Sequence, residues 1–342
     1  MDELKTPIEK FSYSKMSTYE SCPWRYKLQY VDKHFIDTPS ISADFGTIVH
    51  YVEETIANDI HANGDEPVFM IDMDKYINLF INGDDECEGI SKLKNRYINE
   101  FYEKDKSGLT FEDKANEYLN RGIYMLQDFL NANRNIKIVG AEIPFEVPYG
   151  DRIFHGFIDR LLLDEATGTY IIQDLKTWMS IDNHSLATPL QFVFYTQAIM
   201  DMYNVSIDNV KCEYVLPIIG QVHSAGTKGY MTRGKTKIDK LLMAITQQDF
   251  KPKPSPLCHW CCFSATYPDQ PEEAKNLCPY HSNWTRESKD FSTNFVWAGL
   301  ENHAIILEDF IKRVDQLIEP EPQAITGMIP AVEAGRYFLL RR

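Results

Sequence analysis

Residues 155–177 read HGFIDRLLLDEATGTYIIQDLKT, which is two apolar runs joined by a short polar turn. The turn ends in Gly168, which can adopt the positive φ that tight turns often require. The stretch therefore predicts a β-hairpin. Asp159 lies in its first strand, and Asp174 and Lys176 end its second strand. Because strand side chains alternate between two faces, Asp174 and Lys176 should share one face.

Acidic side chains within apolar strands need a partner. A buried carboxylate is costly unless it is paired or binds a metal, and two neighbouring carboxylates repel and raise a pKa. A divalent cation removes that repulsion, and oxygen ligands suit Mg²⁺ or Mn²⁺, which also bind phosphates. Lys176 would then hold the attacking water or stabilise charge on the phosphate. The alternative is an exposed hairpin with ordinary surface charges, because Asp-x-Lys is a weak motif.

Length and composition bound the class of protein. The chain has 342 residues, 44% of them hydrophobic, which suffices for one large domain or two smaller ones with a full core. No run of about 18 apolar residues exists to span a membrane. The N-terminal sequence MDELKTPIEK lacks the apolar core of a signal peptide. We therefore expect a cytoplasmic protein of a bacterium or of a phage-infected host cell.

The charge balance excludes one class of DNA-binding protein. The chain carries 35 Lys and Arg against 50 Asp and Glu, a net charge of −15. A protein that simply coats nucleic acid would be basic. A nuclease remains compatible, because it can concentrate its basic groups in one channel. We expect weak and salt-sensitive non-specific DNA binding.

The first part of the chain is helical by pattern. Residues 43–60 carry apolar side chains at helical spacing, with His50 beside that stripe as either a packed or surface residue or a ligand. Cys22, in an aromatic-rich segment, is either a buried thiol or a ligand. Residues 61–135 are charged, and their aromatic side chains either pack in a core or stack on bases. Helical periodicity there covers residues 72–79, 93–102 and 116–130.

The central part alternates strands and helices. Residues 137–149, which contain Glu142, predict a strand ahead of the hairpin. A helix follows over residues 187–204, where Gln191 and Tyr195 share one face. Residues 210–219 predict another strand, residues 220–234 a loop, and residues 235–250 a helix. The order β, β, β, α, β predicts an α/β fold with a central mixed sheet flanked by helices.

The cysteines point to a metal. The chain has seven, and four of them fall between positions 258 and 278. In a cytoplasmic protein this clustering favours metal binding over disulfides. Cys-x2-Cys at 258 and 261, followed by Cys278-x2-His281, is a fair zinc pattern. Beyond it, the tail predicts a helix around residues 295–317 and a short strand-like run at 337–340.

Taken together and in order, these pieces resemble the PD-(D/E)XK nuclease superfamily. They are most similar to its RecB/AddB branch with an iron–sulfur cluster, which includes AddB and the CRISPR adaptation nuclease. Each mark is weak alone, but the ordered set spans about residues 11–281. The marks are Ser12-x-Ser14, Cys22-Pro23, Gly46-Thr47-x2-His50, Glu142, Gly156-x-Ile158-Asp159, Asp174-x-Lys176, Gln191-x3-Tyr195 and Cys258-x2-Cys261 with Cys278.

The resemblance implies a restriction-endonuclease-like core and specific roles. Mg²⁺ or Mn²⁺ would be bound by His50, Asp159, Asp174 and the carbonyl of Leu175. Lys176 would be the catalytic lysine, Glu142 an accessory acid, and Gln191 and Tyr195 would hold DNA. A [4Fe–4S] cluster would be bound by Cys22, Cys258, Cys261 and Cys278, which would tie the N-terminal segment to the C-terminal region.

Two departures keep a zinc site as the alternative to the cluster. The gap before Cys278 is long, and Cys262 offers an extra thiolate. His281 or Cys262 could replace Cys278 as a ligand. Zinc, however, leaves Cys22 without a role.

The resemblance implies a metal-dependent deoxyribonuclease, an exonuclease acting on DNA ends in recombination, repair or phage replication. A helicase or recombination partner would fit this role. The alternatives are a non-catalytic DNA-binding or assembly subunit with the same fold, and a zinc-ribbon DNA-binding protein. We expect five parts: N-terminal helices (1–60), a helical insertion (61–135), a nuclease core (136–250), a cysteine region (251–282) and a helical tail of unknown role (283–342).

Overall fold

The computed structural model describes most of the chain up to residue 278. The described residues are 10–36, 41–64, 73–92, 111–132, 135–177, 181, 183–217, 220–255, 258, 261–265, 267 and 270–278. The expected helix at 93–102, His281, and the tail helix and strand-like run lie outside these residues. Within the described part, no helix combines the length and the apolar character that crossing a bilayer requires.

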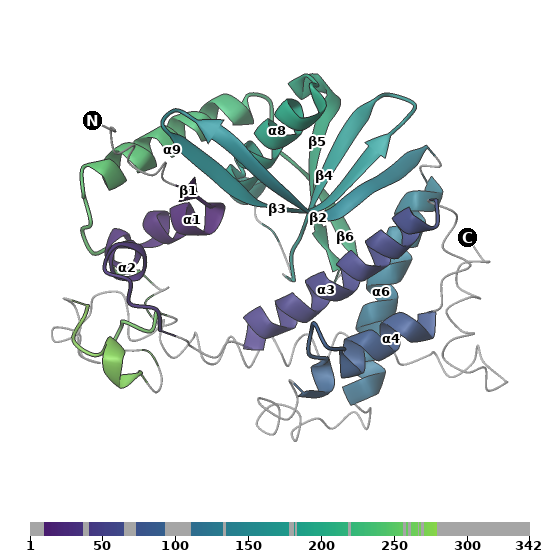
Figure 1. Ribbon diagram of the computed structural model, residues 1–342, viewed down its shortest axis with the longest axis horizontal. Helices are drawn as coiled ribbons and strands as arrows, with labels where there is room; N and C mark the ends of the chain where they lie inside the picture. The colour runs from purple at the N-terminus through teal and green to yellow at the C-terminus, as the bar shows by residue number, and fades with distance from the viewer. Residues whose placement is uncertain are drawn as a thin grey trace, which may run out of the picture.

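In the described part of the chain, six strands form one central mixed sheet (Figure 1). The strand order is β1-β3-β4-β5-β6, and β2 also pairs with β3. β3 is antiparallel to β2 and β4, β4 is parallel to β5, and β5 is antiparallel to β6. The mixed sheet and the hairpin are thus confirmed. The strands are β1 (Lys10–Phe11), β2 (Ile136–Tyr149), β3 (Arg152–Asp164), β4 (Thr169–Leu175), β5 (Val210–Leu216) and β6 (Gln221–Ala225).

Helices cover both faces of this sheet, as the α/β prediction requires. Residues of α1, α8 and α9 share one apolar core with the sheet, and residues of α3, α4 and α6 share a second one. The helices are α1 (Tyr13–Ser21), α2 (Pro23–Tyr26), α3 (Ile41–Ala62), α4 (Met73–Asn82), α6 (Phe111–Ala132), α7 (Asn183–Ala187), α8 (Leu190–Tyr203) and α9 (Tyr230–Thr246), with a π-helical turn at Lys27–Val31.

The predicted loop at residues 220–234 is wrong. β6 occupies part of it, and α9 begins at Tyr230, ahead of the expected start at 235. β6 is a largely exposed edge strand, so it lacks the apolar alternation by which strands are found in a sequence. β1 was also not expected, because two residues carry no periodic signal.

The start of the described chain packs against its end. The hydroxyl of Tyr19 donates to the carbonyl of Asp249 at 2.7 Å, and the indole N–H of Trp24 donates to the carbonyl of Leu277 at 3.0 Å. Leu28 shares a small apolar core with Phe263. These contacts bring α1 and α2 beside the cysteine-containing segment.

Candidate active site

The two strands of the hairpin separate at one end, and Asp159 lies where they part. The paired register of β3 and β4 stops at Arg160 and Gln173, while β4 continues to pair with β5. The backbone N–H of Leu175 therefore lies beyond the backbone pairing of these two strands. The side chain of Asp159 takes that place, since its Oδ2 accepts a hydrogen bond from the N–H of Leu175 at 2.7 Å. We call this place the β3–β4 fork.

The alternation of side chains between the two faces of β3 also changes phase at the fork. Ile158 and Leu161 belong to the same core, under α8 and α9. Residues three apart on a regular strand face opposite sides, so the alternation must shift between them. As a result, the neighbouring side chains of Asp159 and Arg160 both reach residues of α3.

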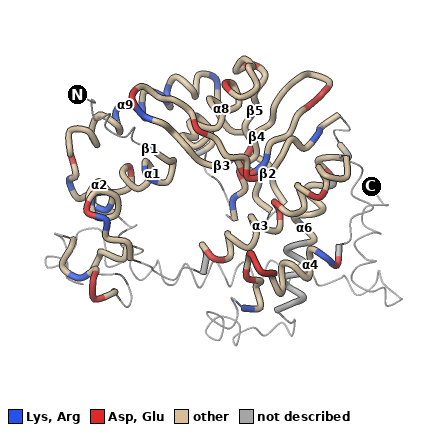
Figure 2. Tube along the Cα trace, in the orientation of Figure 1, with Lys and Arg blue, Asp and Glu red and all other residues tan. Residues whose placement is uncertain are grey.

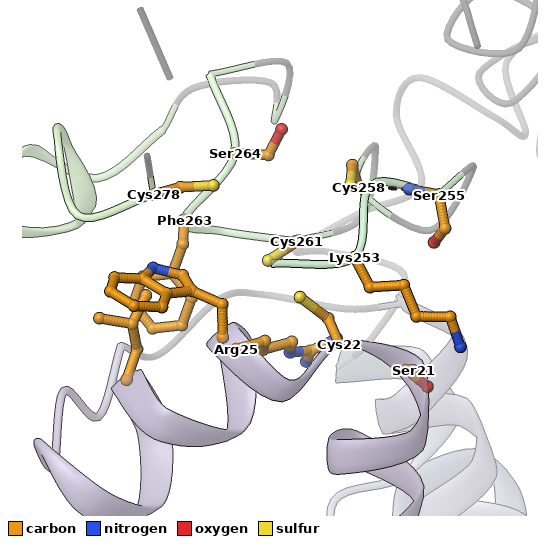
Figure 3. Close-up of a pocket in the computed structure, with 12 residues that line it drawn as sticks. Ser21, Cys22, Arg25, Lys253, Ser255, Cys258, Cys261, Phe263, Ser264 and Cys278 are labelled. Carbon is orange, nitrogen blue, oxygen red and sulfur yellow. Dashed lines mark hydrogen bonds between the residues drawn. The ribbon is translucent and has the colours of Figure 1, made fainter. Parts of the chain in front are cut away.

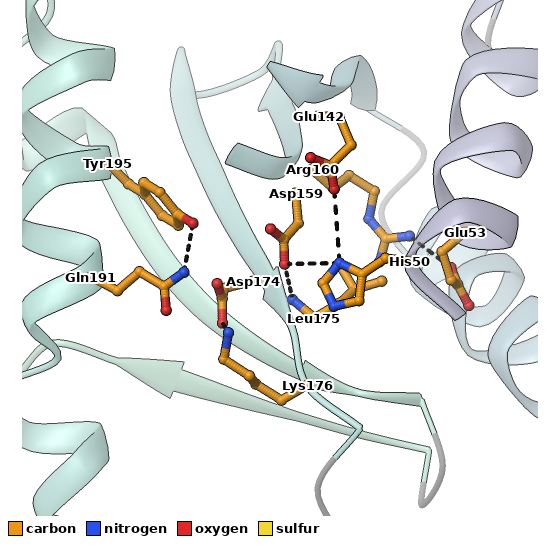
Figure 4. A network of polar contacts seen from close by, with 10 residues as sticks. All are labelled: His50, Glu53, Glu142, Asp159, Arg160, Asp174, Leu175, Lys176, Gln191 and Tyr195. Atoms are coloured by element: carbon orange, nitrogen blue, oxygen red, sulfur yellow. Dashed lines mark hydrogen bonds and ion pairs between the residues drawn. The ribbon is translucent and has the colours of Figure 1, made fainter. Parts of the chain in front are cut away.

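Three donor groups gather in front of the fork (Figure 4). His50 projects from α3, Glu142 from β2 and Asp159 from β3, and one donor atom of each lies within 4.8 Å of the others. The Nδ1 of His50 is 3.7 Å from Oδ2 of Asp159 and 3.8 Å from Oε1 of Glu142. Glu142, expected only as an accessory acid, is therefore a member of the ligand-type group.

The backbone of Glu142 is strained. Its φ is +45°, a conformation that is rare for residues other than glycine and here occurs inside β2. Strain of this kind persists where the surrounding structure enforces it, and it concentrates at functional sites. The strained conformation is the one that directs the carboxylate of Glu142 toward His50.

Asp174 and Lys176 form a separate pair beside this group. Asp174 is fully buried, and its Oδ2 lies 2.5 Å from Nζ of Lys176. Its Oδ1 is buried without a hydrogen-bond partner among the described residues. Asp174, expected as a metal ligand, is thus not in the compact group, but it presents an unsatisfied oxygen next to it.

Burial makes these carboxylates unfavourable as bare anions. Burial, together with the nearby carboxylate of Asp174, raises the pKa of Asp159 to about 7. Burial also raises the pKa of Asp174, although Lys176 opposes it. The pKa of His50 is raised as well, because the carboxylates of Glu142 and Asp159 outweigh burial, which lowers it. These buried carboxylates are therefore stable only when a proton or a cation neutralises their negative charge.

The residues present fit a divalent cation. Two carboxylates and an imidazole converge from three elements, and a buried carboxylate oxygen beside them has no hydrogen-bond partner within the described chain. Carboxylate oxygens suit Mg²⁺ and Mn²⁺, and the imidazole adds a ligand that suits transition-metal ions.

Gln191 and Tyr195 lie across the fork on α8. They are one turn apart, and the Nε2 of Gln191 donates to the Tyr195 hydroxyl at 2.6 Å. Burial, with Asp174 next, raises the pKa of the Tyr195 phenol, so it remains protonated. Tyr13 of α1, which the sequence did not single out, also lies near Lys176. Burial raises the pKa of Tyr13 and the charge of Lys176 opposes this shift.

A buried ion pair behind the site also escaped the sequence analysis. Arg160 is 2% exposed and Glu53 6%, and the Nη1 of Arg160 donates to Oε2 of Glu53 at 3.2 Å. The Nε of Arg160 donates to Gln173 at 2.8 Å. Glu53 lies one turn after His50, so this pair fastens α3 to β3 next to the candidate ligands. Gly122 of α6 makes room for Glu53, because a Cβ there would lie 2.4 Å from its Oε1.

The four expected cluster cysteines line one cavity (Figure 3). It has a volume of about 40 Å³ and lies between α2 and the C-terminal segment. Among the described residues, no three of the cysteine sulfurs all lie within 4.8 Å of one another, as the donor atoms at the fork do. The cysteines that line the cavity are Cys22, Cys258, Cys261 and Cys278, whereas Cys262 is buried in the adjacent core.

Comparison with known proteins gives one family match. The model of a family described as the PD-(D/E)XK nuclease superfamily matches residues 10–266. No curated protein matches the sequence. Among solved structures, the chain is similar to a candidate exonuclease from Eubacterium rectale, with 12% identity over 74% of this chain and 87% of the other. The TM-score of that superposition is 0.41, which is too low to support an argument.

Proposed function

Because the chain belongs to the PD-(D/E)XK nuclease superfamily, we propose that it hydrolyses phosphodiester bonds of DNA at the β3–β4 fork with a divalent cation. The observation that carries this proposal is the convergence of His50, Glu142 and Asp159 beside the buried pair of Asp174 and Lys176. A non-catalytic subunit would have no need to keep such an unfavourable cluster of buried acids.

In this proposal the cation, Mg²⁺ or Mn²⁺, is held by His50, Glu142 and Asp159, with Asp174 and the carbonyl of Leu175 as further ligands. A divalent cation there supplies Lewis acidity to the phosphate and favours deprotonation of a nearby water. Glu142 is added to the expected ligand set because its carboxylate shares the compact group.

Lys176 supplies the positive charge. Burial lowers its pKa, but the carboxylates of Asp174 and Asp159 outweigh this effect and raise it, so Lys176 is protonated at neutral pH. The ion pair with Asp174 fixes the position of its ammonium group. From there Lys176 orients the attacking water or neutralises charge that develops on the phosphate. Gln191 and Tyr195 would hold the DNA strand at the same site.

We further propose that the enzyme is an exonuclease of the RecB/AddB type, acting on DNA ends in recombination, repair or phage replication in the cytoplasm. A helicase would be its natural partner. The second candidate, a DNA-binding or assembly subunit, would bind DNA equally well in EDTA and in Mn²⁺ but would cleave it in neither.

We also propose that Cys22, Cys258, Cys261 and Cys278 hold a [4Fe–4S] cluster. Four cysteine thiolates are the usual ligands of such a cluster. All four cysteines line one cavity, and a zinc site without Cys22 would leave that residue without a role. The role of the cluster would be structural, because it joins α2 to a segment more than 200 residues away.

Digestion of end-labelled DNA tests the nuclease proposal. We expect wild type to degrade DNA in Mg²⁺ or Mn²⁺ but not in EDTA, and Lys176→Ala to lose at least about 10²-fold in rate. Lys251→Ala is the matched control, because Lys251 has a side chain that is 87% exposed. Full activity in Lys176→Ala would overturn the assignment, and inactivity of wild type with intact DNA binding would favour the assembly subunit.

A further inference from the structure

Phe157 presents an aromatic ring to solvent beside the fork. It is 56% exposed, whereas its neighbour Ile158 is fully buried. Because strand residues alternate, Phe157 and Asp159 face the same side of β3, opposite Ile158. Two residues along a strand span about 7 Å, a distance that one nucleotide can bridge.

The sheet fixes the backbone that carries this ring. Phe157 pairs in register with Pro144 of β2, which is also exposed. The preceding Gly156 packs tightly on the core, since a Cβ there would lie 3.1 Å from the ring of Phe145. Single exposed apolar residues are common and need no explanation by themselves. What distinguishes Phe157 is its position on rigid backbone next to the carboxylate that we place at the reacting phosphate.

We propose that Phe157 stacks on an unpaired base of the strand whose phosphate lies at the fork. This inference rests on the proposed nuclease function and deepens it by assigning to the same site a residue that contacts the base. The net charge is −15, and acidic and basic residues are interspersed along the described elements (Figure 2). The overall charge therefore contributes little to DNA affinity, which leaves a role for contacts other than ion pairs.

Stacking is the contact that a lone aromatic ring offers to nucleic acid. It tolerates any sequence, because every base has a π-face. It also requires a base that is not enclosed in a duplex. An exposed ring beside the reacting phosphate thus selects strands that have left the double helix, such as those at a frayed or unwound end.

Binding to labelled oligonucleotides in EDTA tests the proposal without cleavage. Phe157→Leu keeps an apolar side chain without the ring and should weaken single-strand binding about tenfold. Phe157→Trp should restore it. Binding of a blunt duplex should change little in either variant. Phe35→Leu is the matched control, because Phe35 is 77% exposed and lies outside the fork.

A series of oligonucleotides with one abasic position each locates the contact. Removing the stacked base should weaken binding to wild type by a similar factor, and it should have no further effect on Phe157→Leu. This loss of additivity is the signature of a direct contact. The abasic series on wild type and on Phe157→Trp gives the answer even if Phe157→Leu folds poorly.

Equal single-strand binding by wild type and Phe157→Leu would overturn the inference. So would a loss in Phe157→Leu that is equally large for single strands and for blunt duplex. Failure of wild type to bind single strands would overturn it as well. The nuclease proposal fails separately. If wild type binds single strands through Phe157 but does not digest them in Mn²⁺, the stacking site stands and the nuclease proposal falls.

Discussion

At the scale of single residues, the conformation of Glu142 matters as much as its charge. Its φ of +45° places a carboxylate among the candidate ligands at a conformational cost. Glu142→Gly and Glu142→Ala both remove the carboxylate, but only glycine relieves the strain. We expect the glycine variant to be more stable than the alanine variant by about 1 kcal/mol.

Chemical denaturation of the two variants measures this difference. Both should lose DNA cleavage, which separates the role of the carboxylate from the effect of strain. If the alanine variant is as stable as the glycine variant, the backbone at position 142 is not strained. As a reference, the same pair of changes at exposed Glu146 of β2 should favour alanine, because glycine weakens a regular strand.

At the scale of elements, the ion pair of Arg160 and Glu53 fixes α3 against β3. Arg160→Met leaves Glu53 buried without its charged partner and should cost about 3–5 kcal/mol. The double variant Arg160→Met with Glu53→Leu removes both charges and should recover most of that loss.

Cleavage rates then distinguish an effect of the ion pair on the position of His50 from its effect on the stability of the fold. If the pair positions His50, the double variant should stay folded yet cleave DNA more slowly, with the loss in kcat rather than in KM. A double variant as active as wild type would limit the pair to a structural role. If the double variant loses as much stability as the two single variants together, the two residues do not interact as a pair.

The elements differ in how well the sequence predicts them. The hairpin of β3 and β4, α3 and the helices around residues 73–82 and 111–132 follow from local periodicity, which a single sequence contains. β6 does not, because an exposed edge strand carries no apolar alternation. The pair of Arg160 and Glu53 does not either, since its partners are 107 positions apart in sequence.

The candidate site divides in the same way. The residues named from the sequence do gather at the fork, but their grouping came from the structure, with Glu142 in the compact group and Asp174 paired to Lys176. That grouping depends on the phase change of β3 and on the strained φ of Glu142, which no local pattern reveals. The expected five-part division of the chain stays a prediction.

At the scale of the whole molecule, the cysteine cavity joins the N-terminal helices to residues 258–278. If it holds the proposed cluster, Cys22→Ser should abolish the visible absorption of the purified protein. It should also lower the melting temperature, because the tie across this long loop is lost. Cys87→Ser is the control, because Cys87 lies outside the cavity and should affect neither measurement.

Metal analysis accompanies this prediction. Iron and sulfide in wild type, both lost in Cys22→Ser, would support the cluster. One zinc per chain without colour would contradict it. A melting temperature unchanged in Cys22→Ser would show that the cavity does not stabilise the fold.

The central claim is that the fork binds a divalent cation through Asp159 and its neighbours. Electron paramagnetic resonance of Mn²⁺ titrated into the protein tests it most directly. Asp159→Asn is the chosen variant, because its amide oxygen can still accept the hydrogen bond from Leu175 while the negative charge is lost. Since the pKa of Asp159 is raised to about 7, protons compete with the cation below that pH and not above it. We predict one Mn²⁺ site in wild type that binds more tightly at pH 8 than at pH 5.5 and is lost in Asp159→Asn. Equal binding by wild type and Asp159→Asn would contradict the account.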